Sequence, residues 1–215
     1  MKLIKLLAIC ALFIGLFGCI SPKSYVDPSS QKYTYEDVKR RSEPLKLKLT
    51  VEFQRHGEVY PKAESTLRDS AERTLRATGF IIPAEEGTAG DIKIIVNNTG
   101  DRGAAAAKGF GTGLTFGLIG NTVQDNYDLT MIITIKGKTI TKSDIHNSIF
   151  TAIGNTSVPS GVQTSTVSVA FSKVLEQMIL QGLKELQTTK ELSYEDSGNT
   201  MSNTLISWMA LISAL

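Results

Sequence analysis

Few residues in this 215-residue chain have the types and spacing that catalysis or metal binding requires. The two histidines, His56 and His146, have no other His, Cys, Asp or Glu at a metal-ligand spacing such as HExxH. Three serines on expected helices also lie outside any GxSxG nucleophile elbow: Ser65, Ser70 and Ser168. We therefore expect two surface histidines and a protein that is not an enzyme, with no catalytic residue, metal ion or other cofactor.

A glycine-rich segment, residues 103–123, is the strongest candidate for a phosphate-binding loop. A dinucleotide-binding loop needs GxGxxG directly at the end of a strand, opening a helix within a βαβ unit. Here Gly109 lies well beyond the end of the preceding predicted strand, and strands of a hairpin follow the segment. A P-loop fits no better, because Lys108 precedes its glycine and no Ser or Thr follows the lysine. We expect no bound nucleotide.

At helical spacing the same segment shows rows of small residues four positions apart. Such rows let helix backbones approach closely in lipid, whereas each glycine in a helix in water costs about 1 kcal/mol relative to alanine. We expect one lipid-inserted helix or a tight helical hairpin; a flexible glycine loop over the sheet is the alternative. The residues expected to contact the membrane or a second subunit are Ala105, Gly109, Gly113, Phe116, Gly117 and Leu118.

Residues 1–18 are predicted to be a signal peptide. Lys2 and Lys5 precede an apolar run that is too short to span a bilayer. The sequence Leu-Phe-Gly before Cys19 resembles the lipobox of bacterial lipoproteins, in which the cysteine is acylated and becomes the first residue. The resemblance implies that Cys19 is the lipid attachment site, and the absence of an aspartate after it implies the outer membrane. A secreted protein with a chance cysteine is the alternative.

Removal of this peptide leaves 21 basic and 21 acidic residues. A neutral chain does not favour a nucleic-acid partner, since binding to phosphate backbones depends on a basic excess. Cys10 would leave with the peptide and Cys19 would carry lipid, so that neither a disulfide nor a thiol nucleophile remains. No feature of the sequence indicates a small-molecule substrate.

Residues 45–187 are predicted to form one α+β domain. Strict apolar–polar alternation over 45–53 predicts a half-buried strand, and two further short strands and a long hairpin follow. Apolar residues every four positions predict a helix that ends at Gly79 and a second helix at the end of the domain. We expect a mostly antiparallel sheet of four to five strands, covered on one face by two helices, with a Gly/Ala-rich helical insertion at 103–123.

Two flanking segments are expected to lie outside this domain. Residues 19–44, the lipidated cysteine and a polar stretch with three prolines, are predicted to be a flexible tether. Such a tether would hold the domain roughly 25–30 Å from the lipid. Residues 188–215 are predicted to be a polar linker and an apolar segment, of which 204–215 would be an interfacial or partner-contacting helix with Trp208 at the boundary. Packing of 204–215 on the domain's own core is the alternative.

This layout resembles the TraT family of outer-membrane lipoproteins, which act in surface exclusion and complement resistance. The likeness covers about residues 45–187 and rests on short stretches in the same order: LRATGF, DIKIIV, the Gly/Ala-rich insertion, DNYDLTMIITI and SGVQTSTVSVAF. In that family the insertion is longer and packs between the subunits of a ring that enters the outer membrane. The resemblance implies a homo-oligomer in the outer membrane, with membrane contact through the lipid and through residues 103–123 and 204–215. The alternative is a periplasmic binding or assembly lipoprotein that grips an envelope protein or a lipid.

Overall fold

The computed structural model describes residues 22–100, 120–189 and 192 of the chain. Its strands and helices alternate irregularly along the chain, as in an α+β protein. Their bounds are β1 Lys23–Val26, η1 Tyr35–Asp37, β2 Leu45–Arg55, β3 Glu58–Val59, η2 Pro61–Ala63, α2 Glu64–Thr78, β4 Ile81–Pro83, β5 Gly90–Asn98, β6 Asn121–Ile135, β7 Lys138–Ile153 and α4 Val167–Thr188.

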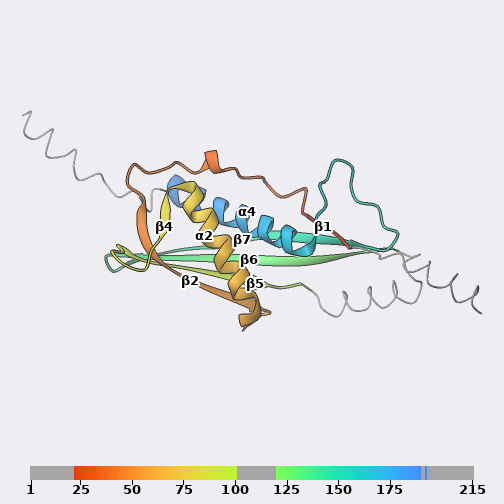
Figure 1. Cartoon of the computed structure of the whole chain (residues 1–215), viewed down its shortest axis with the longest axis horizontal. Coiled ribbons are helices and arrows are strands. Elements are labelled where there is room, and N and C mark those ends of the chain that lie inside the picture. The colour runs from red at the N-terminus through yellow and green to blue at the C-terminus, as the bar shows by residue number, and fades with distance from the viewer. Residues whose placement is uncertain (1–21, 101–119, 190–191, 193–215) are drawn as a thin grey trace, which may run out of the picture.

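The seven strands form one sheet in the order β1-β7-β6-β5-β2-β3, with β4 beside the start of β2. β2 runs parallel to β4 and β5, and every other pairing is antiparallel. The sheet is elongated along β6 and β7 and has two distinct ends (Figure 1). The β1 end is where β1 and β6 begin and β7 ends, and the hairpin end carries the Lys136–Gly137 turn between β6 and β7.

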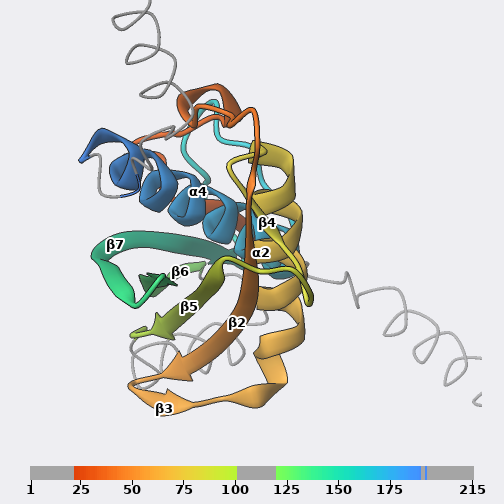
Figure 2. The ribbon, with the colours of Figure 1, turned by 90° about the vertical axis from the view of Figure 1, so that its left-hand side faces the viewer.

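One face of the sheet is apolar and the other is polar, because the strands alternate as the sequence predicts. In β2, Leu47, Leu49, Val51 and Phe53 are buried while the residues between them are exposed or half-buried. Helices α2 and α4 both lie over the apolar face (Figure 2). They bury the apolar stripes expected from the sequence: Leu67, Ala71 and Leu75 in α2, and Ala170, Val174, Met178, Ile179, Leu183 and Leu186 in α4.

A β-bulge in β7 changes which of its residues face the core. Leu129 of β6 pairs with Ile145, but Met131 pairs with Lys142, so two residues of β7 lie opposite the single residue Thr130 of β6. Asp144, one of the two, has a φ of 62°. The buried positions shift from even to odd numbers across the bulge, from Ile140 to Ile145. The bulge therefore re-aims the second half of β7 toward α4.

The strand count is a correction to the sequence analysis. An α+β fold with a mostly antiparallel sheet and two helices is confirmed, but the sheet has seven strands rather than four or five. β1 and β3 were missed because four and two residues are too few to show alternation. Residues 121–123, expected to end the helical insertion, begin β6 instead. Of the rest of the insertion, Gly120 is described, and residues 103–119 lie outside the described residues.

The segment between β1 and β2, residues 27–44 (the strap), is held against α4. The side-chain amide of Gln177 accepts a hydrogen bond from the backbone N–H of Tyr33 at 2.8 Å and donates one to its carbonyl at 2.9 Å. Gln187 makes the same pair with the backbone of Lys39, at 2.8 and 2.7 Å. Val38 is 3% exposed and belongs to the core. The strap is thus packed against the domain at three points.

This packing corrects the expected flexible tether over residues 19–44. In the described part, β1 pairs with the end of β7 and the strap follows α4. The sequence shows no apolar periodicity there, because main-chain pairing and two glutamine side chains on a distant helix hold the segment. Leu192, within the expected polar linker of 188–215, is also buried in the core at 8% exposed.

Replacing Gln177 by alanine tests how the strap is held. Gln177→Ala removes two hydrogen bonds to the strap, and at about 0.5–1.5 kcal/mol each the free energy of unfolding should fall by about 1–3 kcal/mol. Amide hydrogen exchange at Tyr33 should become faster. Gln181→Ala is the matched control, since Gln181 lies one turn further along α4 and bonds only Glu185 in the described structure. An equal loss of stability in both variants would contradict this account of the strap.

Candidate functional site

The β1 end of the sheet brings together three parts of the chain that are distant in sequence. β1 starts at Lys23, which pairs with Ala152 near the end of β7, and Ala152 pairs with Thr122 near the start of β6. Thr99, just after β5, donates its backbone N–H to Asn126 of β6 at 2.9 Å. The residues on both sides of 101–119 and the first strand after Cys19 therefore lie at one end of the molecule (Figure 1).

Gly100 and Gly120, the described residues on either side of 101–119, are each pressed against neighbouring backbone. A Cβ atom on Gly100 would lie 2.9 Å from Asp125 Oδ1 and 3.2 Å from its Cα. A Cβ on Gly120 would collide with Asn155 and Thr156 in the loop after β7. Gly120 thus needs glycine for close approach, whereas a side chain at Gly100 would be tight against Asp125.

Tyr127 is the most strongly perturbed titratable group at this end. Its side chain is packed against Phe171, with ring centroids 5.3 Å apart, and is 6% exposed. Burial, with Asp125 as the next cause, raises the pKa of Tyr127 to about 12, and the side chain of Asn98 opposes the rise. Because burial is the largest cause, the raised pKa reflects the packing of the Tyr127 side chain in the core.

Alkaline unfolding should reflect this shift. The pKa of Tyr127 rises from 10.0 to about 12 on folding, so between these values the folded state holds a proton that the unfolded state has lost. The contribution of Tyr127 to the free energy of unfolding is therefore fully present below pH 10 and is lost as the pH rises toward 12. Tyr127→Phe should make the free energy of unfolding, measured by urea denaturation, fall less steeply over that range. If the free energies of unfolding of the wild type and of Tyr127→Phe fell in parallel from pH 7 to 12, the role of Tyr127 would be contradicted.

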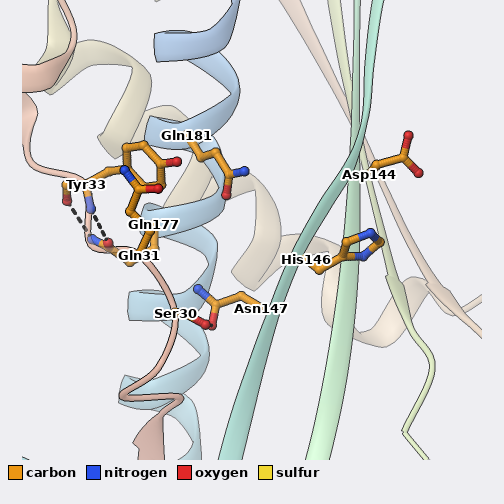
Figure 3. A pocket seen from close by; sticks show the side chains of 8 residues that line it. All are labelled: Ser30, Gln31, Tyr33, Asp144, His146, Asn147, Gln177 and Gln181. Atoms are coloured by element: carbon orange, nitrogen blue, oxygen red, sulfur yellow. Dashed lines mark hydrogen bonds between the residues drawn. The ribbon is translucent and has the colours of Figure 1, made fainter.

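A polar cavity of about 220 Å³ opens beside the bulge of β7 (Figure 3). The strap, α4 and β7 form its walls. Its lining is Ser30, Gln31, Tyr33, Asp144, His146, Asn147, Gln177 and Gln181. Four of these side chains are neutral amides, which both donate and accept hydrogen bonds.

The hydrogen bonds in this cavity do not assemble a nucleophile and a base. Ser30 donates to Asn147 Oδ1 at 3.2 Å, and Asn147 also accepts from the backbone of Ser148. His146 Nδ1 lies 2.6 Å from Asp128 Oδ1, and its ring points away from Gln177 and Gln181 across β7 (Figure 3). The arrangement suits hydrogen bonding to a neutral polar group, such as a peptide main chain or a hydroxyl-rich ligand.

The residues singled out in the sequence are placed as follows. His56 and His146 are both exposed, as expected, and His56 lies in the tight turn between β2 and β3 with a φ of 52°. The predicted lipid site, Cys19, lies outside the described residues. So do the six expected membrane or subunit contacts: Ala105, Gly109, Gly113, Phe116, Gly117 and Leu118.

The sequence analysis missed the polar cavity. Its residues come from three separate segments, and amide side chains have no diagnostic spacing. The shift from Ile140 to Ile145 in the apolar alternation of β7 was the one available signal, because it marks the bulge beside the cavity. The sequence can therefore predict a bulge, but not which residues of the strap and α4 lie opposite the bulge.

Within residues 22–100, 120–189 and 192, no cluster of three or more His, Cys, Asp or Glu side chains is arranged to hold a metal ion. In the same described part of the chain, no helix is long and apolar enough to cross a membrane.

Comparison with known proteins shows no close relative. No protein-family model matches the sequence, and no curated protein is similar to it. A dodecameric PelC variant from Paraburkholderia phytofirmans is 13% identical, with a TM-score of 0.33, over 77% of this chain and 97% of the other. An uncharacterized protein is 11% identical, with a TM-score of 0.25, over 73% of this chain and 99% of the other. At these scores neither likeness carries an argument about function or assembly.

Proposed function

We propose that the protein is a non-enzymatic lipoprotein, anchored in the outer membrane through Cys19, that assembles with copies of itself through residues 103–123. Its role would be at the envelope surface, in the manner of the TraT family that the sequence layout resembles. One observation carries the proposal: β1 and the residues flanking 101–119 meet at one end of the sheet. A lipid on Cys19 and the glycine-rich segment would then meet the same membrane.

The position of β1 makes this anchor short. Lys23 follows Cys19 by four residues, so the lipidated cysteine would lie at most about 14 Å from the start of β1. The tether of roughly 25–30 Å expected from the sequence is replaced by this shorter connection. Because one acyl chain gives only marginal binding, several chains on Cys19 would be needed for a permanent attachment.

The rows of small residues support contact between copies of the chain. Gly109, Gly113 and Gly117 are four positions apart, as in helices that pack closely in lipid. The residues that flank 101–119 are themselves fixed against the sheet, since Gly100 contacts Asp125 and Gly120 contacts the loop after β7. A segment projecting from such a fixed base would keep a defined orientation toward a neighbouring copy.

The anchor is tested by replacing Cys19 with alanine. We expect the wild-type protein in the outer-membrane fraction, with processing that is blocked by globomycin, because acylation precedes cleavage in lipoproteins. Cys19→Ala should leave the precursor uncleaved. Normal cleavage of that variant would overturn the lipoprotein assignment.

Self-association is tested by adding a side chain to one row of small residues. Detergent-extracted wild-type protein should run as a large oligomer by size-exclusion chromatography with light scattering, and Gly113→Leu should run as a monomer because its side chain separates the backbones. Thr112→Leu is the matched control, since it adds a leucine one position away from that row. A monomer in all three proteins would contradict self-association through this segment.

A periplasmic binding or assembly lipoprotein is the second candidate function, and the polar cavity favours it. Asp144–Asn147 of β7 border this cavity, and no strand among the described residues pairs with their outer edge. An extended segment of a partner protein could hydrogen-bond there to the strand and to the amides of Gln31 and Gln181. Under this alternative the wild-type protein extracted in detergent would be a monomer.

A further inference from the structure

The polar cavity between the strap, α4 and β7 has one rigid wall and an unused hydrogen-bond donor. Gln177 is fixed in this wall by its two hydrogen bonds to the main chain of Tyr33. Asn147, which is 7% exposed, accepts hydrogen bonds from Ser30 and Ser148 through Oδ1, but its Nδ2 group donates to no other described residue. Because a buried donor without an acceptor is costly, this amide needs an acceptor inside the cavity.

An unused acceptor lies on the opposite wall. Asn147 points from β7 toward α4 and the strap, and Gln181 extends from α4 toward β7 (Figure 3). Gln181 donates through Nε2 to Glu185 at 2.9 Å, and among the described residues its Oε1 accepts no hydrogen bond. Tyr33 adds an aromatic ring and a hydroxyl group to the lining. The cavity therefore presents a donor, an acceptor and an aromatic ring from three separate segments.

The lining offers an anion no counter-charge. Neither lysine nor arginine is among the lining residues of the described structure. Asp144 and His146 line the cavity from β7, but their side chains point away from α4 (Figure 3), and His146 is paired with Asp128 at 2.6 Å. The other lining side chains are neutral amides and hydroxyls. The ligand that fits them is uncharged and carries groups that both donate and accept hydrogen bonds.

The size of the cavity favours a compact ligand. Its volume of about 220 Å³ is below the roughly 300–1,000 Å³ of sites for drug-sized molecules. It equals the volume of about seven water molecules at roughly 30 Å³ each. One sugar ring is a ligand of this size class.

The open edge of β7 beside the cavity is also short. The bulge at Asp144 bounds this edge on one side. On the other side the backbone N–H of Asp27 already donates to the carbonyl of Ser148 at 3.0 Å. Residues 145–147 lie between these two points, whereas strands usually have about five or six residues. A compact ring therefore suits this edge better than an added strand does.

We propose that the cavity binds a single neutral hexopyranose ring, with its hydroxyl groups hydrogen-bonded to Asn147 and Gln181. A hydroxyl group both donates and accepts, so one sugar satisfies the Nδ2 group of Asn147 and the Oε1 atom of Gln181. The C–H groups of the sugar match the aromatic ring of Tyr33. The site uses neither Cys19 nor residues 103–123, so this proposal and the function proposed above fail separately.

Saturation-transfer NMR with simple glycosides tests the site. The probes are methyl β-glucoside, methyl β-galactoside and methyl α-mannoside, added to the full-length protein in a detergent without a sugar headgroup. At least one glycoside should receive saturation, and glucuronic acid, which carries a carboxylate, should receive much less. Gln181→Leu removes the free acceptor and should weaken binding about 2–10-fold, as expected for one hydrogen bond. Gln163→Leu is the matched control and should bind like the wild type, because Gln163 is an exposed glutamine that does not line the cavity.

Three outcomes would overturn the proposal. If none of the glycosides receives saturation, the cavity holds water alone. Transfer to a neutral extended peptide, acetyl-trialanine amide, in place of the glycosides would make the occupant a peptide main chain. Gln31→Leu is a second variant, at an exposed position of the lining. Unchanged affinity in both Gln181→Leu and Gln31→Leu would place the sugar elsewhere on the protein.

Discussion

The main-chain pairing between β1 and β7 is the constraint on which the rest of the molecule depends. Four residues, Lys23–Val26, pair with Ile149–Ala152, and Ser24 and Thr151 add a buried hydroxyl pair at 2.9 Å. Stacking of Tyr25 on Phe150, with centroids 5.6 Å apart, reinforces the register. This short strand turns the expected tether into an edge of the sheet. It therefore decides which end of the domain lies nearest to Cys19.

The two ends of the sheet differ in what they bring together. The β1 end gathers the chain after Cys19 and the residues flanking 101–119, where Gly100 and Gly120 are packed against neighbouring backbone. The hairpin end holds a groove lined by both apolar and charged residues, among them Leu192, which is 8% exposed. The strap joins the two ends along α4 through paired hydrogen bonds from Gln177 and Gln187. The proposed anchor at the β1 end is thus separated from the hairpin end by the length of the sheet.

Local patterns predicted the parts of the fold that local physics controls. Alternation of apolar and polar residues predicted β2, and apolar residues at every fourth position predicted α2. The end of α2 at Gly79 has the expected positive φ of 63°. The strap was not predictable, because two glutamines, 144 and 148 residues further along the chain than their partners, hold it. The polar cavity was missed for the same reason. The expected lipid and subunit contacts, Cys19 and the residues of 103–119, stay predictions because they lie outside the described residues.

The orientation of the domain on the membrane is the most direct test of the central claim. Fluorophores attached at Asn155→Cys, in the loop at the β1 end, and at Lys138→Cys, beside the hairpin turn, mark exposed positions at opposite ends of the sheet. In vesicles carrying the lipidated protein, spin-labelled headgroups should quench the label at 155 strongly and leave the label at 138 unaffected. Equal quenching at both positions, or stronger quenching at 138, would contradict an anchor at the β1 end.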